Sequence, residues 1–197
     1  MTINECEMFI EELFKIREIM SDRVIILDTE TTGLSPKTGH RIIEIGCLEM
    51  VDRKLTGEKF HTYLQPYRFV EIGAFMVHGI SDAFLADKPR FNDICPDFLE
   101  FIKKDEIIAH NAQFDLGFLD NECRLSDHFV QPFTSLSDEN KITCTKRLAE
   151  SKFGRGGNSL NELCVRFGID KSERALHGAL IDCELLAQVY LKLTEDE

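Results

Sequence analysis

The order of apolar and polar residues along the chain predicts three strands in its first third. Val24-Ile25-Ile26-Leu27 is a short apolar run, typical of a buried strand. The stretch from 31 to 40 is rich in Gly, Thr, Ser and Pro and indicates a loop. Residues 41–51 and 58–64 are expected to form two further strands, joined by a turn over 52–57.

After these strands, the pattern alternates between strands and helices. Short strands are expected at 107–109 and 141–143. Apolar residues at helical spacing predict helices over 91–102, 112–125, 145–151, 159–167 and 178–193. A strand meander followed by alternation predicts an α/β fold, with a mixed sheet flanked by helices in a single domain.

The first 22 residues are expected to form a helical extension to a domain that spans 23–197. Asn4-Glu5-Cys6-Glu7 resembles a capping box. Apolar residues then recur at helical spacing, at Phe9, Leu13, Ile16 and Met20. This helix would dock on the domain's own surface or offer a face to a partner.

Composition indicates a soluble cytoplasmic protein. The chain has 197 residues, 43% of them hydrophobic and 29% charged, which is ordinary for a globular domain. No apolar run approaches the roughly 20 residues that span a bilayer, and the N-terminus is acidic where an export signal needs positive charge. The seven cysteines form no C-x-x-C pair. They indicate reduced, buried side chains rather than disulfides or a zinc site.

The net charge of −12 argues against a protein that coats nucleic acid by charge alone. Such proteins are usually basic, because neutralising phosphates supplies most of their non-specific affinity. An enzyme that reaches phosphates through bound cations remains compatible with this charge, because its metal-binding carboxylates add negative charge.

Asp28 and Glu30 form the first candidate pair for chemistry. Side chains two apart on a strand share a face, so these carboxylates would lie side by side where the buried strand ends. Close anions repel unless a proton or cation lies between them, and oxygen ligands suit Mg²⁺ or Mn²⁺. A solvated strand end whose acids cap the next loop would explain the pair equally well.

Two later segments carry further candidates with simpler alternatives. Asp115 follows His110-Asn111 in the first turn of an expected helix, where the helix dipole favours an acid whatever its function. His177 precedes Asp182 by five residues, and on one continuous helix they would be about 140° apart. They converge only if His177 lies before the helix, a break that Gly178 permits; otherwise His177 is an incidental surface or packing residue.

Taken in order, these segments resemble the DEDDh group of 3′→5′ exonucleases, and within it the proofreading (epsilon) subunits of bacterial DNA polymerase III. The resemblance covers about residues 24–193. The segments that carry it are Asp28-Thr29-Glu30-Thr31-Thr32-Gly33, Ile43-Glu44-Ile45-Gly46, Val77-His78-Gly79-Ile80, His110-Asn111-Ala112-Gln113-Phe114-Asp115, Asn158-Ser159-Leu160 and Leu176-His177-Gly178-Ala179-Leu180-Ile181-Asp182.

The resemblance implies a ribonuclease H-like fold with a mixed five-stranded sheet. It implies that Asp28, Glu30, Asp115 and Asp182 hold two divalent ions, Mg²⁺ or Mn²⁺, and that His177 is the general base that deprotonates the attacking water. DNA would be hydrolysed from its 3′ end to nucleoside 5′-monophosphates. The substrates would be single-stranded or frayed 3′ ends, and the expected partner is the catalytic (alpha) subunit of DNA polymerase III.

Substrate contacts are also carried over from the family. They are expected at Asp28, Glu30, Thr31, Leu34, His78, Asn111, Phe114 and His177, with core packing as an equal alternative for Phe114. His40, His61 and His128 match no catalytic position, and we expect surface or strand residues there.

Two departures and two alternatives accompany the resemblance. Cys144 replaces an aspartate usual in the family, which is expected to affect helix capping or hydrogen bonding around the site rather than the metals. The chain ends at Glu197, where the family's polymerase-binding tail would follow, as in a truncated or short form.

An RNA-directed relative would use the same acids. A non-catalytic binding module would keep the fold, but such modules typically lose an acid or the histidine.

Overall fold

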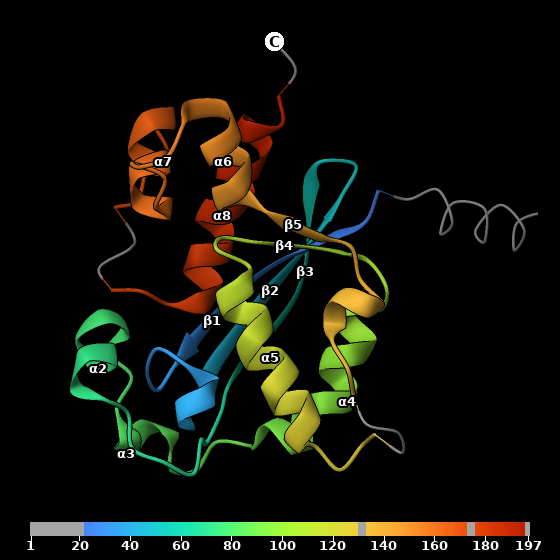
Figure 1. Ribbon diagram of the computed structural model, residues 1–197, viewed down its shortest axis with the longest axis vertical. Helices are drawn as coiled ribbons and strands as arrows, with labels where there is room; N and C mark the ends of the chain where they lie inside the picture. The colour runs from blue at the N-terminus through green and yellow to red at the C-terminus, as the bar shows by residue number, and fades with distance from the viewer. Residues whose placement is uncertain (1–21, 130–132, 173–175, 196–197) are drawn as a thin grey trace, which may run out of the picture.

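A mixed sheet of five strands forms the centre of the computed structural model, which describes residues 22–129, 133–172 and 176–195 (Figure 1). The strand order is β3-β2-β1-β4-β5. The strands are β1 Val24–Thr31, β2 Ile42–Val51, β3 Lys54–Tyr63, β4 Glu106–Ala109 and β5 Ile142–Cys144. β1 pairs antiparallel with β2 and parallel with β4, and β4 pairs parallel with β5. The expected mixed five-stranded sheet is confirmed.

The central strand β1 is buried on both faces because its apolar residues alternate between two cores. Ile26 packs with Leu48 and residues of the C-terminal helices, whereas Ile25 and Leu27 pack with Phe98 and other residues of the middle helices. A continuous apolar run is therefore the pattern this strand requires.

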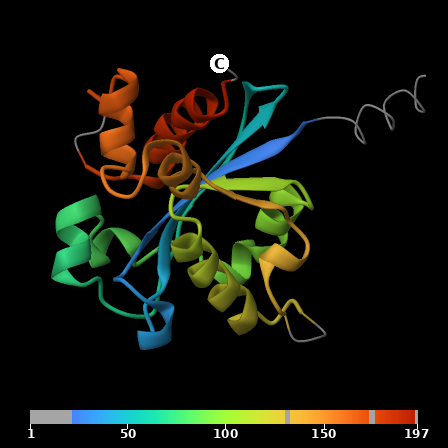
Figure 2. The same cartoon turned by 45° about the horizontal axis from the view of Figure 1, so that its top comes forward.

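Helices cover the two faces of the sheet (Figures 1 and 2). α6, α7 and α8 cover one face, and α4 and α5 cover the other. Their bounds are α4 Phe91–Ile102, α5 Gln113–Leu125, α6 Thr145–Phe153, α7 Leu160–Phe167 and α8 Ala179–Leu193. All five agree with the expected helices to within two residues at each end. Single turns of 3₁₀ helix occur at Pro36–Thr38 and Leu136–Asp138. None of the described helices is both long and apolar enough to cross a bilayer.

Three differences from the sequence expectations have local causes. β3 begins at Lys54 rather than Glu58, because Asp52 and Arg53 adopt positive φ angles of 49° and 63° and close a tight turn. The helices α2 (Ile72–His78) and α3 (Asp82–Leu85) were not predicted. Each buries a single side chain, so no apolar stripe marks them.

The approach of α8 to β2 depends on Gly46. A Cβ at this position would lie 2.6 Å from the backbone carbon of Ala179, closer than real side chains come. Glycine therefore lets the first turn of α8 rest on the sheet beside β1. Apart from Asp22, the expected N-terminal helical extension over residues 1–22 lies outside the described residues.

Candidate active site

The carboxyl end of β1 carries Asp28 and Glu30, as the sequence predicts. In the antiparallel register Asp28 lies opposite Gly46, and Glu30 lies opposite Glu44. Glu30 is buried, with 8% of its surface exposed. Because Gly46 has no side chain, the first turn of α8 comes down on the same part of the sheet. The carboxyl end of β1 is therefore covered by the first turn of α8.

Asp115 joins these acids from the first turn of α5. Its Oδ1 accepts hydrogen bonds from the backbone N–H of Thr29 at 3.1 Å and from the Thr29 hydroxyl at 2.8 Å. Burial raises the pKa of Asp115 to about 7, against the lowering effect of the Thr29 hydrogen bonds. An acid whose only role is a favourable interaction with the helix dipole could remain exposed to solvent. Asp115 is instead buried and held against β1 by Thr29, the residue between Asp28 and Glu30 in the sequence.

His177 and Asp182 converge because the helix begins between them. Gly178 is the N-cap of α8, with an extended φ of −159°, so His177 lies outside the helix, as the convergence requires. His177 Nδ1 lies 3.1 Å from Asp182 Oδ2. The backbone N–H of His177 donates to Val77 O at 3.2 Å, which ties this segment to α2.

These side chains line one cleft of about 290 Å³. Its lining consists of Asp28, Thr29, Glu30, His110, Asn111, Phe114, Asp115, Ser159, Leu160, Asn161, His177 and Asp182. Among the described residues, no lysine or arginine belongs to this lining. Four carboxylates therefore share a confined space with no lysine or arginine of the described residues among them.

The donor set suits a divalent cation. One ligand atom each from Glu30, His177 and Asp182 lies within 4.8 Å of the other two. Carboxylate oxygens are the preferred ligands of Mg²⁺ and Mn²⁺, and a cation would offset the repulsion of the acids. Asp28 and Asp115 add oxygen ligands from the same lining.

The expected substrate positions divide into two groups. Asn111 and Phe114 line the cleft, and the Phe114 ring also packs on Phe118 with centroids 5.0 Å apart. Thr31, Leu34 and His78 lie outside the lining. Thr31 is buried and its hydroxyl donates to Gly33 O, whereas Leu34 is 85% exposed. His78 is buried at the end of α2, where its Nδ1 accepts from the backbone N–H of Ile80 at 3.0 Å.

Sequence reasoning assigned no role to five lining residues, namely Thr29, His110, Ser159, Leu160 and Asn161. His110 bonds through Nδ1 to the Thr145 hydroxyl at 3.0 Å. Burial, and next the charge of Lys146, lower the pKa of His110 to about 4, so the ring is neutral near pH 7. His110 and Ser159 lie in motifs that support the resemblance, but their place in the cleft depends on how α6 and α7 pack.

The expectation that His40 is a surface or strand residue is wrong. His40 is buried, its ring lies against Gly33, and its Nδ1 is 3.0 Å from the Thr32 hydroxyl. It supports the loop after β1 because Gly33 leaves room for the ring. His61 lies in β3, and His128 is exposed.

None of the six described cysteines forms a disulfide, and five of the six are buried. Cys144, the exception, is half-buried at the N-cap of α6 and makes no side-chain capping hydrogen bond. The expected effect of this residue on helix capping is consistent with that geometry.

Comparison with known proteins identifies clear relatives. The model of a family described as Exonuclease (RNase_T) matches residues 25–190. DNA polymerase III subunit epsilon of Escherichia coli K12 is 46% identical over 176 residues, which cover 87% of this chain and 71% of that protein. The subunit of the same name from Rickettsia felis is 51% identical over 172 residues, covering 87% and 74%.

Solved structures share the fold. Exonuclease X in complex with 5′ overhanging duplex DNA superposes with a TM-score of 0.64 at 25% identity, covering 86% of this chain and 90% of that one. The nuclease domain of 3′hExo, a DEDDh family member bound to rAMP, gives a TM-score of 0.72 at 20% identity, covering 88% and 92%. The latter likeness concerns the fold alone.

Proposed function

This chain belongs to the exonuclease family and is a 3′→5′ exonuclease, and from that premise we propose that it proofreads DNA as part of a polymerase III assembly. Its substrate would be a single-stranded or frayed 3′ end of DNA, and its product a nucleoside 5′-monophosphate. The nuclease domain would comprise residues 23–197, with residues 1–22 as an extension.

The observation that carries this proposal is the convergence of four carboxylates with His177 in one cleft. The acids come from β1, α5 and α8, and among the described residues no lysine or arginine lines the space. A carboxylate-rich site that cleaves phosphodiesters must bring anions to an anion, and bound cations would supply the compensating charge that the lining lacks.

We assign Asp28, Glu30, Asp115 and Asp182 as the residues that would hold two Mg²⁺ or Mn²⁺ ions. Such ions lower the pKa of a bound water and stabilise the charge that develops on the leaving 3′ oxygen. The protein's own residues keep the site in place: Thr29 fixes the Asp115 carboxylate, and Gly46 admits the helix that carries Asp182.

His177 is assigned as the general base. Its side chain is 41% exposed, in the cleft and outside the helix, so it can accept the proton of the attacking water and pass it to solvent. Imidazole suits this task because its unperturbed pKa is close to neutral pH.

The terminal nucleotide would contact residues inside and beside the cleft. Asn111 and Phe114 belong to the lining, where Phe114 offers an aromatic surface to a base. Thr31 would act through its backbone and the exposed Leu34 through packing on the last base, with His78 at the end of α2 near the sugar.

The partner would be the polymerase III catalytic subunit. The Escherichia coli and Rickettsia felis relatives are themselves named as DNA polymerase III subunits. With a net charge of −12, the chain is expected to bind DNA weakly and to lose affinity as salt rises. Tethering to a polymerase would supply the local concentration that affinity does not.

The test is digestion of a 3′-mismatched DNA primer with Mn²⁺, with EDTA, and with an RNA strand of the same sequence. We expect stepwise release of 5′-monophosphates from DNA, none with EDTA, and slower release from RNA. Faster cleavage of RNA would overturn the DNA assignment. No release from either strand would indicate a binding module that keeps the fold.

A further inference from the structure

Glu44 is a buried acid that the reaction outlined above does not use. It lies on β2 directly opposite Glu30, and only 2% of its surface is exposed. Cross-strand partners project from the same face of a sheet, so Glu44 shares the face of the strand acids. It is absent from the cleft lining and from the cluster of candidate metal ligands.

One oxygen of Glu44 is held by a neighbour on β3. His61 Nε2 lies 2.8 Å from Glu44 Oε1. The His61 side chain remains 28% exposed, whereas that of Glu44 is 3% exposed. Tyr63, opposite Glu44 in the register, adds a nearby hydroxyl; burial, and next the charge of Glu44, raise the pKa of Tyr63.

The other oxygen points at the start of α8. Oε2 is buried, and no described residue makes a hydrogen bond of ordinary geometry to it. A Cβ at position 178 would lie 4.0 Å from Oε2, so the carboxylate lies directly under the backbone of Gly178. Gly178 is the N-cap of α8 and supplies no side-chain cap.

A buried carboxylate and an uncapped helix N-terminus stabilise each other. The N-terminus carries partial positive charge from its unpaired backbone N–H groups, and a buried anion needs such compensation. Packing of Ala179 on Gly46 fixes the helix itself. The carboxylate therefore acts mainly on the segment just before the helix, which is His177-Gly178.

That segment has further contacts, among them the approach of His177 Nδ1 to Asp182 Oδ2 at 3.1 Å. The His177 N–H bonds to Val77 O, and Leu176 Cδ1 lies 2.6 Å from where a Cβ of Gly79 would be. We propose that Glu44, held by His61, is a positioning residue that fixes the His177-Gly178 segment and so aims His177 into the cleft. This inference rests on the proposed function only for its effect on rate.

Kinetics of Glu44→Gln test the effect on rate. This variant keeps the shape but removes the charge, and we expect kcat to fall about tenfold, the order of effect of a buried charge at a helix N-terminus. KM and the affinity for Mn²⁺ should stay within about twofold, because Glu44 touches neither substrate nor the metal ligands' cleft. Glu49→Gln, on the same strand, is the matched control and should keep the wild-type kcat.

Amide hydrogen exchange tests the positioning without any activity. In Glu44→Gln the His177 amide should exchange about tenfold faster, while amides inside α8 such as Leu186 stay unchanged. His61→Gln should shift both readouts in the same direction, and the double variant should add little to either. His61→Gln also serves as the test variant if Glu44→Gln does not fold.

The outcomes separate the two proposals. Faster exchange at His177 in a protein without nuclease activity would support the positioning role and reject the proposed function. Unchanged exchange with unchanged kcat would overturn the positioning role. A fall in kcat that follows a matching loss of Mn²⁺ affinity would also overturn it, because Glu44 would then act through the metals.

Discussion

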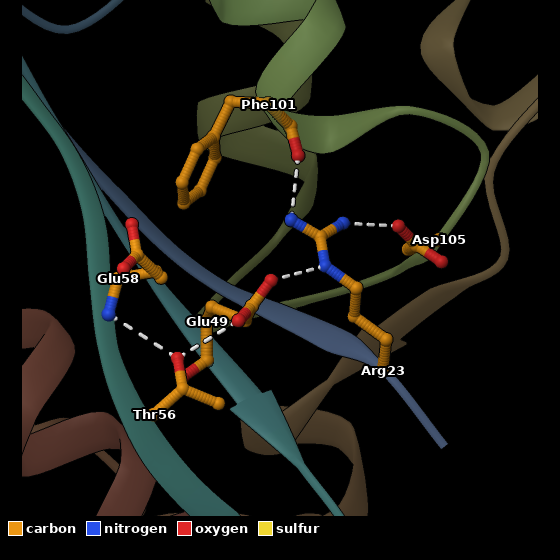
Figure 3. Close-up of polar contacts among 6 residues, drawn as sticks. All are labelled: Arg23, Glu49, Thr56, Glu58, Phe101 and Asp105. Carbon is orange, nitrogen blue, oxygen red and sulfur yellow. Dashed lines mark hydrogen bonds and ion pairs between the residues drawn. The ribbon is translucent and has the colours of Figure 1, made fainter. Parts of the chain in front are cut away.

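The two ends of β1 differ in how the charge of nearby carboxylates is balanced. At the amino end, the Arg23 guanidinium binds the carboxylates of Glu49 and Asp105 and donates to Phe101 O at 2.9 Å (Figure 3). Thr56 adds a hydrogen bond to Glu49 at 2.8 Å. At the carboxyl end, four acids line a cleft to which no described lysine or arginine contributes.

The pKa values follow the same division. Burial acts to raise the pKa of Glu49, but hydrogen bonds from Arg23 and Thr56 outweigh it and hold that pKa below its usual value. Burial raises the pKa of Asp115 to about 7, because it outweighs the hydrogen bonds from Thr29 and from the backbone of Asp115 itself. Acids that serve the fold are neutralised within the protein. The acids at the carboxyl end have no lysine or arginine in the cleft lining, so a bound cation would balance their charge.

Replacing an acid at the carboxyl end should have the largest effect. Asp28→Asn removes one charged ligand without changing shape, and we expect the rate of nucleotide release to fall about 10³-fold. The thermal midpoint should hardly change, since repulsion among the acids is relieved. A folded variant with most of its rate would show that Asp28 is not a metal ligand.

His177→Ala should have the next largest effect. Loss of a general base is expected to cost about 10²-fold in rate. Calorimetry should find Mn²⁺ binding largely retained, because the four carboxylates remain. His177→Ala with a wild-type rate across neutral pH would remove the general-base assignment.

At the amino end, Arg23→Met should affect stability and not activity. The change leaves Glu49 and Asp105, both partly buried, without their cation, at a cost of about 1–2 kcal/mol. Thermal unfolding in EDTA measures this cost, and the rate per folded molecule is the control. A lower rate per folded molecule in this variant would contradict the claim that the ion pairs at the amino end affect stability alone.

The last expected effect is on stability alone, because the raised pKa of Asp115 makes the stability of metal-free protein depend on pH. Its folded pKa of about 7 exceeds its ordinary value of 3.8, so the unfolded chain releases this proton first as pH rises. Metal-free protein should therefore lose stability relative to Asp115→Asn as pH rises from about 4 to 7, by up to about 4 kcal/mol. Urea unfolding of both proteins measures this difference, and a constant gap would contradict the raised pKa.

The sequence predicts the strands and long helices well because their apolar residues face inward. β1 is an unbroken apolar run, and α4 buries Phe91, Cys95, Phe98 and Ile102 at helical spacing. α2 escapes prediction because Ile72 and Met76 face solvent, with 82% and 71% of their surfaces exposed. Apolar residues that point outward carry no periodic signal of burial.

Some features of the candidate site can be predicted from the sequence, and others depend on how distant elements pack. The motifs locate the four acids and His177, but local spacing leaves open where α8 begins, and only the extended backbone at Gly178 resolves it. Ile43-Glu44-Ile45 is an ordinary strand pattern in the sequence. The burial of Glu44 depends on a helix packed from the far end of the chain.

Calorimetric titration of Mn²⁺ into metal-free protein tests the difference between the two ends most directly. We predict binding by the wild type and by Arg23→Met with equal affinity, and loss of binding in Asp28→Asn. Equal binding by all three proteins would contradict the assignment of the carboxyl-end acids as the metal site.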